Sequence, residues 1–342
     1  HSAMASAEAR RLCPQAIWTH GHFDRYREVS AQVMAILADE TPRVERVSID
    51  EAFIDITPGR FAPEDPLLVA RRISDRVAAL GVTCSIGVGC NKTVAKIASE
   101  RDKPFGLTIV RPGTEQRFLA ALPVSAMSGI GRSAEERLRR MRIYTLGELS
   151  RAPESTLASI FGVNGERMRQ RALGLEISEV TSLDEEREVK SVSNERTFAK
   201  DLTEREDIEA AIALLGESVG RRLRRQGLTG GTVTLKLKYS YGSGRTAQRR
   251  LPHPTDDENI FVAVALELLD NIWQEGMHVR LAGIGMSDFN HQGGIQTDLF
   301  CEVDDRGAQS SNRRGLSVAI DAVRDKFGDT ALSFGRQSRF ND

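Results

Sequence analysis

The sequence has few cysteines and no long hydrophobic run. Its 342 residues include four cysteines, none of them in a Cys-x-x-Cys pair. Four scattered thiols do not form a disulfide framework, which favours the reducing cytoplasm, and no His or Cys stands at zinc-ligand spacing. The apolar stretches are far shorter than the roughly 20 residues of a membrane span, and no signal peptide is visible. We therefore exclude disulfide scaffolds, zinc modules and membrane proteins.

Net charge is also small, with a formal value of −1. This balance argues against a polyanionic partner only if the charge is evenly spread. Residues 218–255 contain none of the 48 acidic residues but nine basic ones. Segregated positive charge is typical of a nucleic-acid site, and a solvated basic surface is an equally good alternative.

Hydrophobic periodicity divides the chain into three regions. In the first 112 residues strands and helices alternate, which predicts a sheet covered by helices on one face. Residues 114–175 show no strand signal, only short helices separated by Gly and Pro. From about Glu188 the pattern predicts two strand–helix–strand units, a split βαβ sheet. We expect helices at 4–12, 22–40, 65–80, 91–102, 205–226, 257–274 and 314–327, and strands at 16–19, 44–49, 52–56, 82–88, 107–110, 232–251 (a pair) and 279–288.

Two adjacent carboxylates, Asp50 and Glu51, stand at the corner between two short apolar strands. Carboxylates do not contribute to apolar packing at such a corner, and their mutual repulsion is unfavourable unless a cation offsets it. Mg²⁺ takes hard oxygen ligands, few of them from protein and the rest from water and substrate phosphates. The pair predicts a magnesium site, and a plain polar turn is the alternative.

The segment 87–93 (Gly-Val-Gly-Cys-Asn-Lys-Thr) joins a strand to a helix. It matches neither a Walker A loop nor a dinucleotide fingerprint, but its glycines allow close backbone packing before a helix N-terminus. The helix region that follows carries Lys92, Lys96 and Lys103. Solvated helix lysines are the simpler interpretation of each one alone.

A Gly-x-Gly hairpin formed by Gly129, Ile130 and Gly131 precedes an arginine-rich helix. Without a Cβ in the way, backbone N–H groups can approach a phosphate, as in a helix-hairpin-helix that grips nucleic acid without reading sequence. An ordinary interhelix turn is the alternative. In the later strand 233–238, alternation places Lys236 and Lys238 on one face and apolar residues on the other.

The segment Gln296-Thr-Asp-Leu-Phe300 lies in a glycine-rich stretch after the last strands. A Gln followed by Leu299 and Phe300 can anchor in an apolar pocket of a partner. Five residues alone are a weak pattern.

Together, the Ser48–Asp55 segment, residues 87–106 and the 129–131 hairpin resemble a Y-family DNA polymerase of the bacterial DNA polymerase IV type. The resemblance runs in the family's order from residue 1 to about residue 335. It implies an α/β multidomain fold: an α+β palm with an incomplete ferredoxin-like sheet, an all-α thumb with the helix-hairpin-helix, and an α+β little finger of split βαβ type. The implied boundaries are 1–16 for the end of the fingers, 17–112 for the palm, 113–185 for the thumb, and 188–342 for the little finger with its clamp-binding segment at 296–300.

The resemblance also implies roles for individual residues. Asp50 and Glu51 would be the catalytic residues that hold two Mg²⁺ ions, and Lys103 would contact the incoming triphosphate. DNA would be held by the hairpin, with a monovalent cation possible there, and by the little finger. The implied DNA-binding residues are Gly129, Ile130, Gly131, Lys236, Lys238, Arg249 and Arg250, and the implied sliding-clamp contacts are Gln296, Leu299 and Phe300.

The implied activity is low-fidelity, template-directed DNA synthesis past damage, by a cytoplasmic monomer that binds primed DNA, a deoxynucleoside triphosphate and a sliding clamp. The alternatives are a non-catalytic DNA- and clamp-binding accessory protein of the same family and a plain DNA-binding module. The family's palm begins with a further strand that carries another metal-binding Asp. That strand and most of the fingers would lie before His1, so we expect the chain to lack part of the active site.

Overall fold

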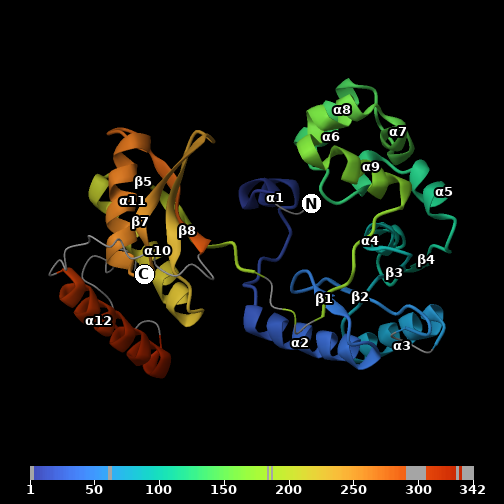
Figure 1. Ribbon diagram of the computed structural model, residues 1–342, viewed down its shortest axis with the longest axis horizontal. Helices are drawn as coiled ribbons and strands as arrows, with labels where there is room; N and C mark the ends of the chain where they lie inside the picture. The colour runs from blue at the N-terminus through green and yellow to red at the C-terminus, as the bar shows by residue number, and fades with distance from the viewer. Residues whose placement is uncertain are drawn as a thin grey trace, which may run out of the picture. The chain divides into compact units, whose positions relative to one another are not determined.

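The computed structural model describes the chain as two compact units, unit 1 (His1–Glu186) and unit 2 (Arg187–Asp342) (Figure 1). Each unit is described by itself. None of the described helices is both long and apolar enough to cross a lipid bilayer. The described residues are 4–60, 64–182, 185, 188–289, 306–328 and 331–332, with side chains from 315 onward in the last helix.

The first half of unit 1 contains short strands in two separate pairs. β1 and β2 are antiparallel, and β3 and β4 are parallel. The sequence predicted one sheet for this region, and the described residues instead form two two-stranded sheets. The predicted strand at 16–19 is wrong, because these residues are exposed and lie beside no partner strand. The elements are α1 (Ser6–Leu12), α2 (Phe23–Glu40), β1 (Val44–Arg46), β2 (Ala52–Ile54), α3 (Pro66–Ala79), β3 (Ile86–Val88), α4 (Lys92–Arg101) and β4 (Leu107–Ile109).

A small apolar core lies where α2 and α3 meet. Ile36 of α2 packs with Val69, Ile73 and Val77 of α3, which recur at helical spacing along one face. Pro66 at the first position of α3 and the Asp65 carboxylate, which accepts from the Leu67 amide at 2.8 Å, start that helix.

The second half of unit 1 is helical, as the sequence predicted. Its core shares the apolar face of α4, where Val94, Ile97 and Ala98 are buried with leucines of the short helices. One core therefore joins α4 to the helices that follow it. These are α5 (Glu115–Ala120), η1 (Val124–Ala126), α6 (Arg132–Arg140), α7 (Leu146–Arg151), α8 (Glu154–Phe161), η2 (Gly162–Asn164) and α9 (Gly165–Leu173).

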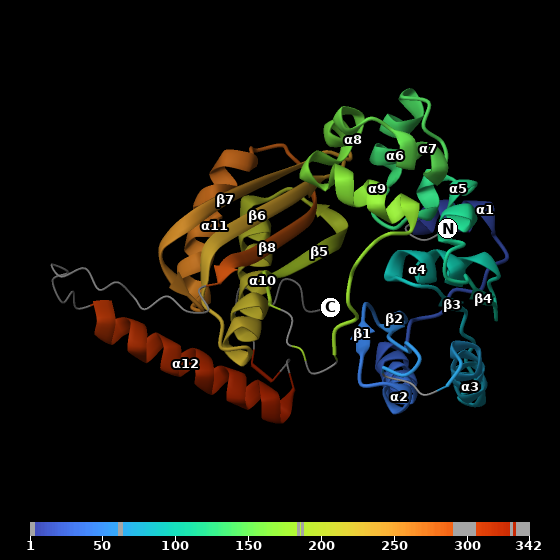
Figure 2. The same ribbon diagram turned by 45° about the vertical axis from the view of Figure 1, so that its right-hand side comes forward.

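Unit 2 has a four-stranded antiparallel sheet in the order β5-β8-β6-β7, with α10 and α11 packed on one face (Figure 2). The element order agrees with the two predicted strand–helix–strand units. The alternation in β6 is as predicted, since Val233, Leu235 and Leu237 are buried against the helices. The elements are β5 (Ser191–Leu202), α10 (Arg205–Arg225), β6 (Gly230–Tyr239), β7 (Gly244–Thr255), α11 (Glu258–Ile272), β8 (Val279–Phe289) and α12 (Arg306–Phe327).

The basic stretch 218–255 is not a free basic surface. Six of its nine basic residues form ion pairs with acids that lie outside the stretch in the sequence. Folding therefore places acids beside most of these basic residues, and the stretch is not uniformly basic. The pairs are Arg221 and Arg225 with Asp325, Arg224 with Asp321 and Glu258, Lys236 with Glu195, Arg249 with Glu267, and Arg250 with Asp288.

Candidate active site and nucleic-acid interface

The two predicted metal-binding carboxylates lie at the corner between β1 and β2. The amides of Val47 and Ser48 donate to the Glu51 carbonyl at 2.9 and 3.1 Å, which closes the turn. The Ser48 hydroxyl donates to the Asp50 carboxylate at 2.5 Å, and Ser30 of α2 donates to the Ile49 carbonyl at 2.5 Å. These bonds leave Asp50 exposed and Glu51 half-buried at a fixed corner.

A chain of alternating charges runs from this corner along α4. Lys96 Nζ lies 2.6 Å from Glu51 Oε1 and 2.9 Å from Glu100 Oε1, and Lys103 Nζ lies 2.8 Å from the same Glu100 oxygen. The structure thus brings Lys103 into one cluster with Glu51. Lys96 and Glu100 are the residues that sequence reasoning did not assign, although their spacing of four on a helix predicts a pair.

The charge chain affects the pKa values of its inner members. Burial alone would lower the pKa of Lys96, but the hydrogen bonds to Glu100 and Glu51 together outweigh it and raise that pKa. The hydrogen bonds from Lys103 and Lys96 lower the pKa of Glu100. At neutral pH the ammonium and carboxylate forms are therefore both favoured.

The glycines of the segment before α4 serve close packing. A Cβ on Gly87 would stand 2.0 Å from the Ala95 carbonyl oxygen and 2.3 Å from the Ser99 nitrogen. The Asn91 side chain caps α4 by accepting from the Val94 amide at 3.0 Å. This contact of β3 with α4 fixes the helix that carries Lys96.

The carboxylate corner fits a magnesium ion that substrate completes. Mg²⁺ usually binds one or two carboxylates together with waters and substrate phosphates. Asp50 and Glu51 supply two carboxylates. In the part of the chain that the structure describes, no three His, Cys, Asp or Glu side chains cluster as a metal site. The donor set therefore suits an open site and not a closed protein cage.

The predicted glycine hairpin lies between η1 and α6. Gly129 has φ +95°, a conformation that side-chain-bearing residues rarely adopt. The Ile130 amide donates to the Met127 carbonyl at 3.1 Å, and the Ile130 side chain is buried in the core. Among the hydrogen bonds of the described residues, the amides of Gly129 and Gly131 have no acceptor. These two donors remain available for a ligand.

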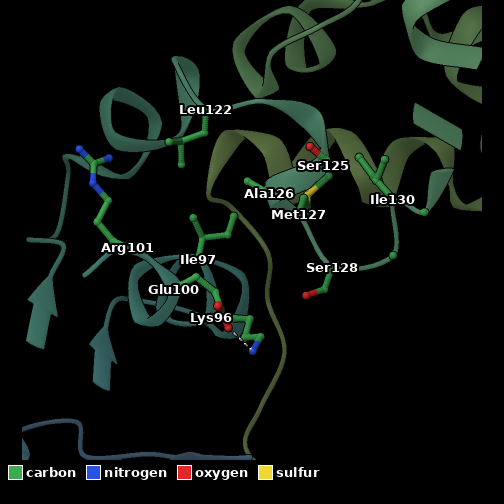
Figure 3. A pocket seen from close by; sticks show the side chains of 12 residues that line it. Lys96, Ile97, Glu100, Arg101, Leu122, Ser125, Ala126, Met127, Ser128 and Ile130 are labelled. Atoms are coloured by element: carbon green, nitrogen blue, oxygen red, sulfur yellow. Dashed lines mark hydrogen bonds and ion pairs between the residues drawn. The ribbon is translucent and has the colours of Figure 1, made fainter. Parts of the chain in front are cut away.

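A cleft of about 700 Å³ lies between the hairpin and α4 (Figure 3). Lys96, Glu100 and Arg101 line it from α4, and residues 125–131 line it from the other side. The cleft therefore joins the charge chain to the free hairpin amides. Sequence reasoning missed it, because the two walls are about 30 residues apart in the chain.

In unit 2, strand alternation and register decide which basic residues face away from the helices. Lys236 and Lys238 lie on that face of β6, and Arg250 lies opposite Thr232 on the same face. Arg249 points to the other face, where it pairs with Glu267 of α11. Consecutive strand residues face opposite ways, so Arg249 and Arg250 lie on different faces of the sheet, and their predicted DNA contacts stay predictions. The predicted clamp contacts Gln296, Leu299 and Phe300 lie outside the described residues.

Comparison with known proteins decides the family. The impB/mucB/samB family matches residues 1–100, and the impB/mucB/samB family C-terminal domain matches residues 189–299. DNA polymerase IV of Dehalococcoides mccartyi (strain CBDB1) is 34% identical over 344 residues, which covers 100% of this chain and 85% of that protein. The chain belongs to the Y-family DNA polymerases, in the DNA polymerase IV group.

Other members of the DNA polymerase IV group agree. The enzyme of Lactococcus lactis subsp. cremoris (strain MG1363) is 37% identical over 294 residues, 85% of this chain and 80% of that protein. The enzyme of Streptococcus pneumoniae serotype 4 is 36% identical over 290 residues, which cover 84% of this chain and 81% of that protein. As a DNA polymerase IV, the chain is a DNA-directed DNA polymerase of the translesion type and belongs to DNA repair.

Solved structures show the same fold. A chimeric Y-family DNA polymerase matches with a TM-score of 0.71 at 23% identity, over 83% of this chain and 81% of that one. The Dbh DNA polymerase in its insertion ternary complex matches with a TM-score of 0.53 at 22% identity, over 84% and 83%. Catalysis in Y-family polymerases is metal-dependent. The expected further metal-binding Asp before His1 stays a prediction.

Proposed function

We propose that unit 1 catalyses nucleotide addition at the β1–β2 corner, with Asp50 and Glu51 as the ligands of two Mg²⁺ ions and Lys103 as a contact of the incoming triphosphate. The observation that carries this proposal is the charge chain Glu51–Lys96–Glu100–Lys103, with pair distances of 2.6, 2.9 and 2.8 Å. It runs from the carboxylate corner along α4 to Lys103, just beyond the end of that helix, so that a nucleotide triphosphate and a primer end can meet there.

The carboxylates of the corner and the lysines of the charge chain differ in their partners, and this suits them to different roles. Asp50 is exposed and has no cationic partner among the described residues, so its carboxylate is open to a metal ion. Lys96 engages only one oxygen of Glu51, and it orients that carboxylate. The pair of Lys103 with Glu100 is half exposed, and such pairs contribute little free energy, so Lys103 can exchange Glu100 for a phosphate.

Mg²⁺ at this corner would supply the in-line displacement chemistry, by activating the primer oxygen and stabilising the leaving pyrophosphate. We assign the palm to residues 17–112, the thumb to 113–185, the little finger to 188–342 and the end of the fingers to 1–16.

DNA would be held through its backbone by two surfaces. The free amides of Gly129 and Gly131 offer donors for a phosphate, directly or through a monovalent cation. Lys236, Lys238 and Arg250 would lie along the duplex from the sheet of unit 2. Backbone contacts of this kind position DNA without reading its sequence, which suits synthesis past damaged bases.

The remaining assignments rest on the family resemblance. We propose that Gln296, Leu299 and Phe300 bind a sliding clamp and that the protein works as a monomer. Its low cysteine content and its family support the cytoplasm as its compartment.

Primer extension by this chain tests the catalytic proposal. Asp50→Asn and Glu51→Gln should each lower extension by at least about 100-fold, because two-metal chemistry needs both carboxylates, while the Kd for primed DNA stays within about twofold. Lys103→Met should raise the KM for the nucleotide more than it lowers kcat. Lys190→Met, which removes one positive charge outside unit 1, is the matched control.

Two outcomes would contradict the proposal. Unchanged extension by Asp50→Asn would exclude the corner as the metal site. DNA binding without any extension, both by this chain and by a version that carries the predicted upstream Asp, would favour the alternative of a non-catalytic accessory protein that binds DNA and clamp.

A further inference from the structure

Arg171 of α9 contacts two elements that form the cleft. Its side chain is only 17% exposed. Nε donates to the Thr93 hydroxyl of α4 at 2.8 Å, and Nη1 donates to the Ser128 carbonyl at 2.8 Å. Burial lowers the pKa of Arg171, but a guanidinium stays protonated at physiological pH. A buried, charged fork thus bridges α4 and the start of the hairpin.

The bond to Ser128 has a consequence for the amide that follows. In a planar trans peptide, the carbonyl oxygen of one residue and the N–H of the next point in opposite directions. Because Arg171 holds the Ser128 oxygen toward α9, the Gly129 N–H points away from α9. This is one of the two amides that have no acceptor among the described residues.

The other end of the fork is secured by a buried carboxylate. The Thr93 hydroxyl donates to Glu176 Oε2 at 2.5 Å, and Arg171 Nε lies 3.6 Å from Glu176 Oε1. The Asn91 side chain, the N-cap of α4, also donates to the Gly174 carbonyl at 2.7 Å. The end of α9 and the start of α4 are thereby held in one arrangement, with Lys96 one turn further along α4.

We propose that Arg171 is a positioning residue: it aims the Gly129 amide outward and sets the distance of the hairpin from α4, so that a primer-strand phosphate is held at a fixed place relative to the carboxylate corner. The inference rests on the proposed role of the hairpin in binding DNA. In this proposal Arg171 acts on the phosphate through the hairpin backbone, by way of its hydrogen bond to the Ser128 carbonyl.

The test measures the Kd of the full chain for a fluorescein-labelled primer–template duplex. Arg171→Met removes both hydrogen bonds and should weaken binding about tenfold, the scale expected when a hydrogen bond to a charged group is lost. Arg167→Met is the matched control. Arg167 lies on the same helix and near the same Glu176 carboxylate, at 3.7 Å, and it has no hydrogen bond to the hairpin among the described residues. It should change the Kd less than twofold.

Arg171→Lys distinguishes a loss of hairpin positioning from a loss of charge and from a failure to fold. Lysine keeps the charge but has a single ammonium, which cannot replace donors at both Nε and Nη1. It should fold as the parent does and bind DNA about threefold more weakly. A Kd equal to that of the parent would overturn the inference, even if Arg171→Met fails to fold.

Gly131→Ala distinguishes failure of this inference from failure of the proposed function. A Cβ there meets nothing within 4 Å, so the fold is kept while the approach to the amides is obstructed. If Arg171 acts through the hairpin, Arg171→Met should weaken the Kd for DNA by less than about threefold when Gly131→Ala is already present. Substitutions of residues that act together do not have additive effects. Full additivity would overturn the inference. Unchanged binding by Gly131→Ala alone would overturn the DNA-binding role of the hairpin itself.

Discussion

Two lysines on the same face of β6 differ in what surrounds them. Lys236 Nζ lies 2.8 Å from Glu195 Oε1 of β5, whereas Lys238 is exposed and has no ion pair among the described residues. Each DNA phosphate that a lysine neutralises releases counterions and changes the slope of log K for DNA binding against log salt concentration by about 0.9. We expect Lys238→Ala to reduce that slope by about one, and Lys236→Ala to reduce it less, because Glu195 already balances the charge of Lys236. Salt titration of the Kd for duplex DNA measures both slopes.

Glu195→Gln is the control for this difference. It removes the competitor of the phosphate, so it should tighten DNA binding and increase the slope. Equal slopes for Lys236→Ala and Lys238→Ala would contradict the role given to Glu195, and a loss confined to particular sequences would contradict backbone binding.

For single residues, the sequence predicted the sheet face of a side chain better than its ion-pair partner. Alternation correctly placed Lys236 and Lys238 together, since the side-chain period of a strand is two. The same rule places Arg249 and Arg250 on opposite faces. Glu195 was not foreseeable, because it comes from a strand 41 residues away, and strand pairing is not readable from one strand alone.

At the scale of elements, the packing of β3 on α4 depends on Gly87. A Cβ there would overlap the backbone of α4, with 2.0 Å to the Ala95 oxygen, and backbone cannot turn aside as a side chain can. We expect Gly87→Ala to lower the free energy of unfolding of unit 1 by about 3 kcal/mol. Urea unfolding followed by circular dichroism measures the loss. Gly131→Ala, where the added Cβ meets nothing, should cost less than about 0.5 kcal/mol.

The contact of α2 with α3 includes an ion pair that should depend on pH. The Glu40 side chain is 7% exposed and lies 2.6 Å from Arg72. The hydrogen bond from Arg72 outweighs burial and lowers the pKa of Glu40 below 4.5. A lowered pKa stabilises the fold above the unfolded value, and that stability is lost as the pH falls through the folded value. We expect Glu40→Gln to cost about 1 kcal/mol at pH 7.

The difference between the parent and Glu40→Gln should stay constant from pH 7 to about pH 4.5 and narrow below it. Thermal denaturation across this range measures it. A difference that widens as the pH falls would contradict the sign. Glu64→Gln, at the more exposed partner of the same Arg72, should have a smaller effect at every pH.

The helices were predicted better than the strands, for a physical reason. A helix completes its backbone hydrogen bonds within one segment, so its periodicity and caps are local signals. A strand needs a partner. Residues 16–19 have apolar character but no neighbouring strand among the described residues, and they are exposed. The three-residue strands β1 to β4 were placed correctly but assembled into the wrong sheet.

At the scale of the whole molecule, the charges of 218–255 show why a linear pattern can mislead. The acids that balance this stretch come from four other elements, and two of them, Asp321 and Asp325, stand on α12. The ion pairs contribute to holding α10 and α12 together inside unit 2. The proposed DNA contacts Lys236, Lys238 and Arg250 are residues of this stretch that lie on the sheet face away from the helices.

The two units have separate apolar cores, and this predicts how the chain unfolds. Among the described residues, the core of unit 2 contains none from unit 1, and the cores of unit 1 contain none from unit 2. Domains with their own cores can fold alone. We expect two urea transitions, which the two tryptophans can separate. Trp273 of unit 2 is 8% exposed and donates to the Met277 carbonyl at 3.0 Å, whereas Trp18 of unit 1 is exposed.

In a Trp18→Phe background, fluorescence therefore reports unit 2 alone. Gly87→Ala should move the transition seen by circular dichroism to lower urea. The free energy of unfolding reported by Trp273 should stay unchanged within about 0.5 kcal/mol, because distant sites without shared partners act independently. A Trp273 midpoint that follows Gly87→Ala would mean that the chain unfolds as one cooperative block. The boundary at 186–187 would then mark a change of architecture and not of stability, and the sheet of unit 2 could not be studied apart from the β1–β2 corner of unit 1.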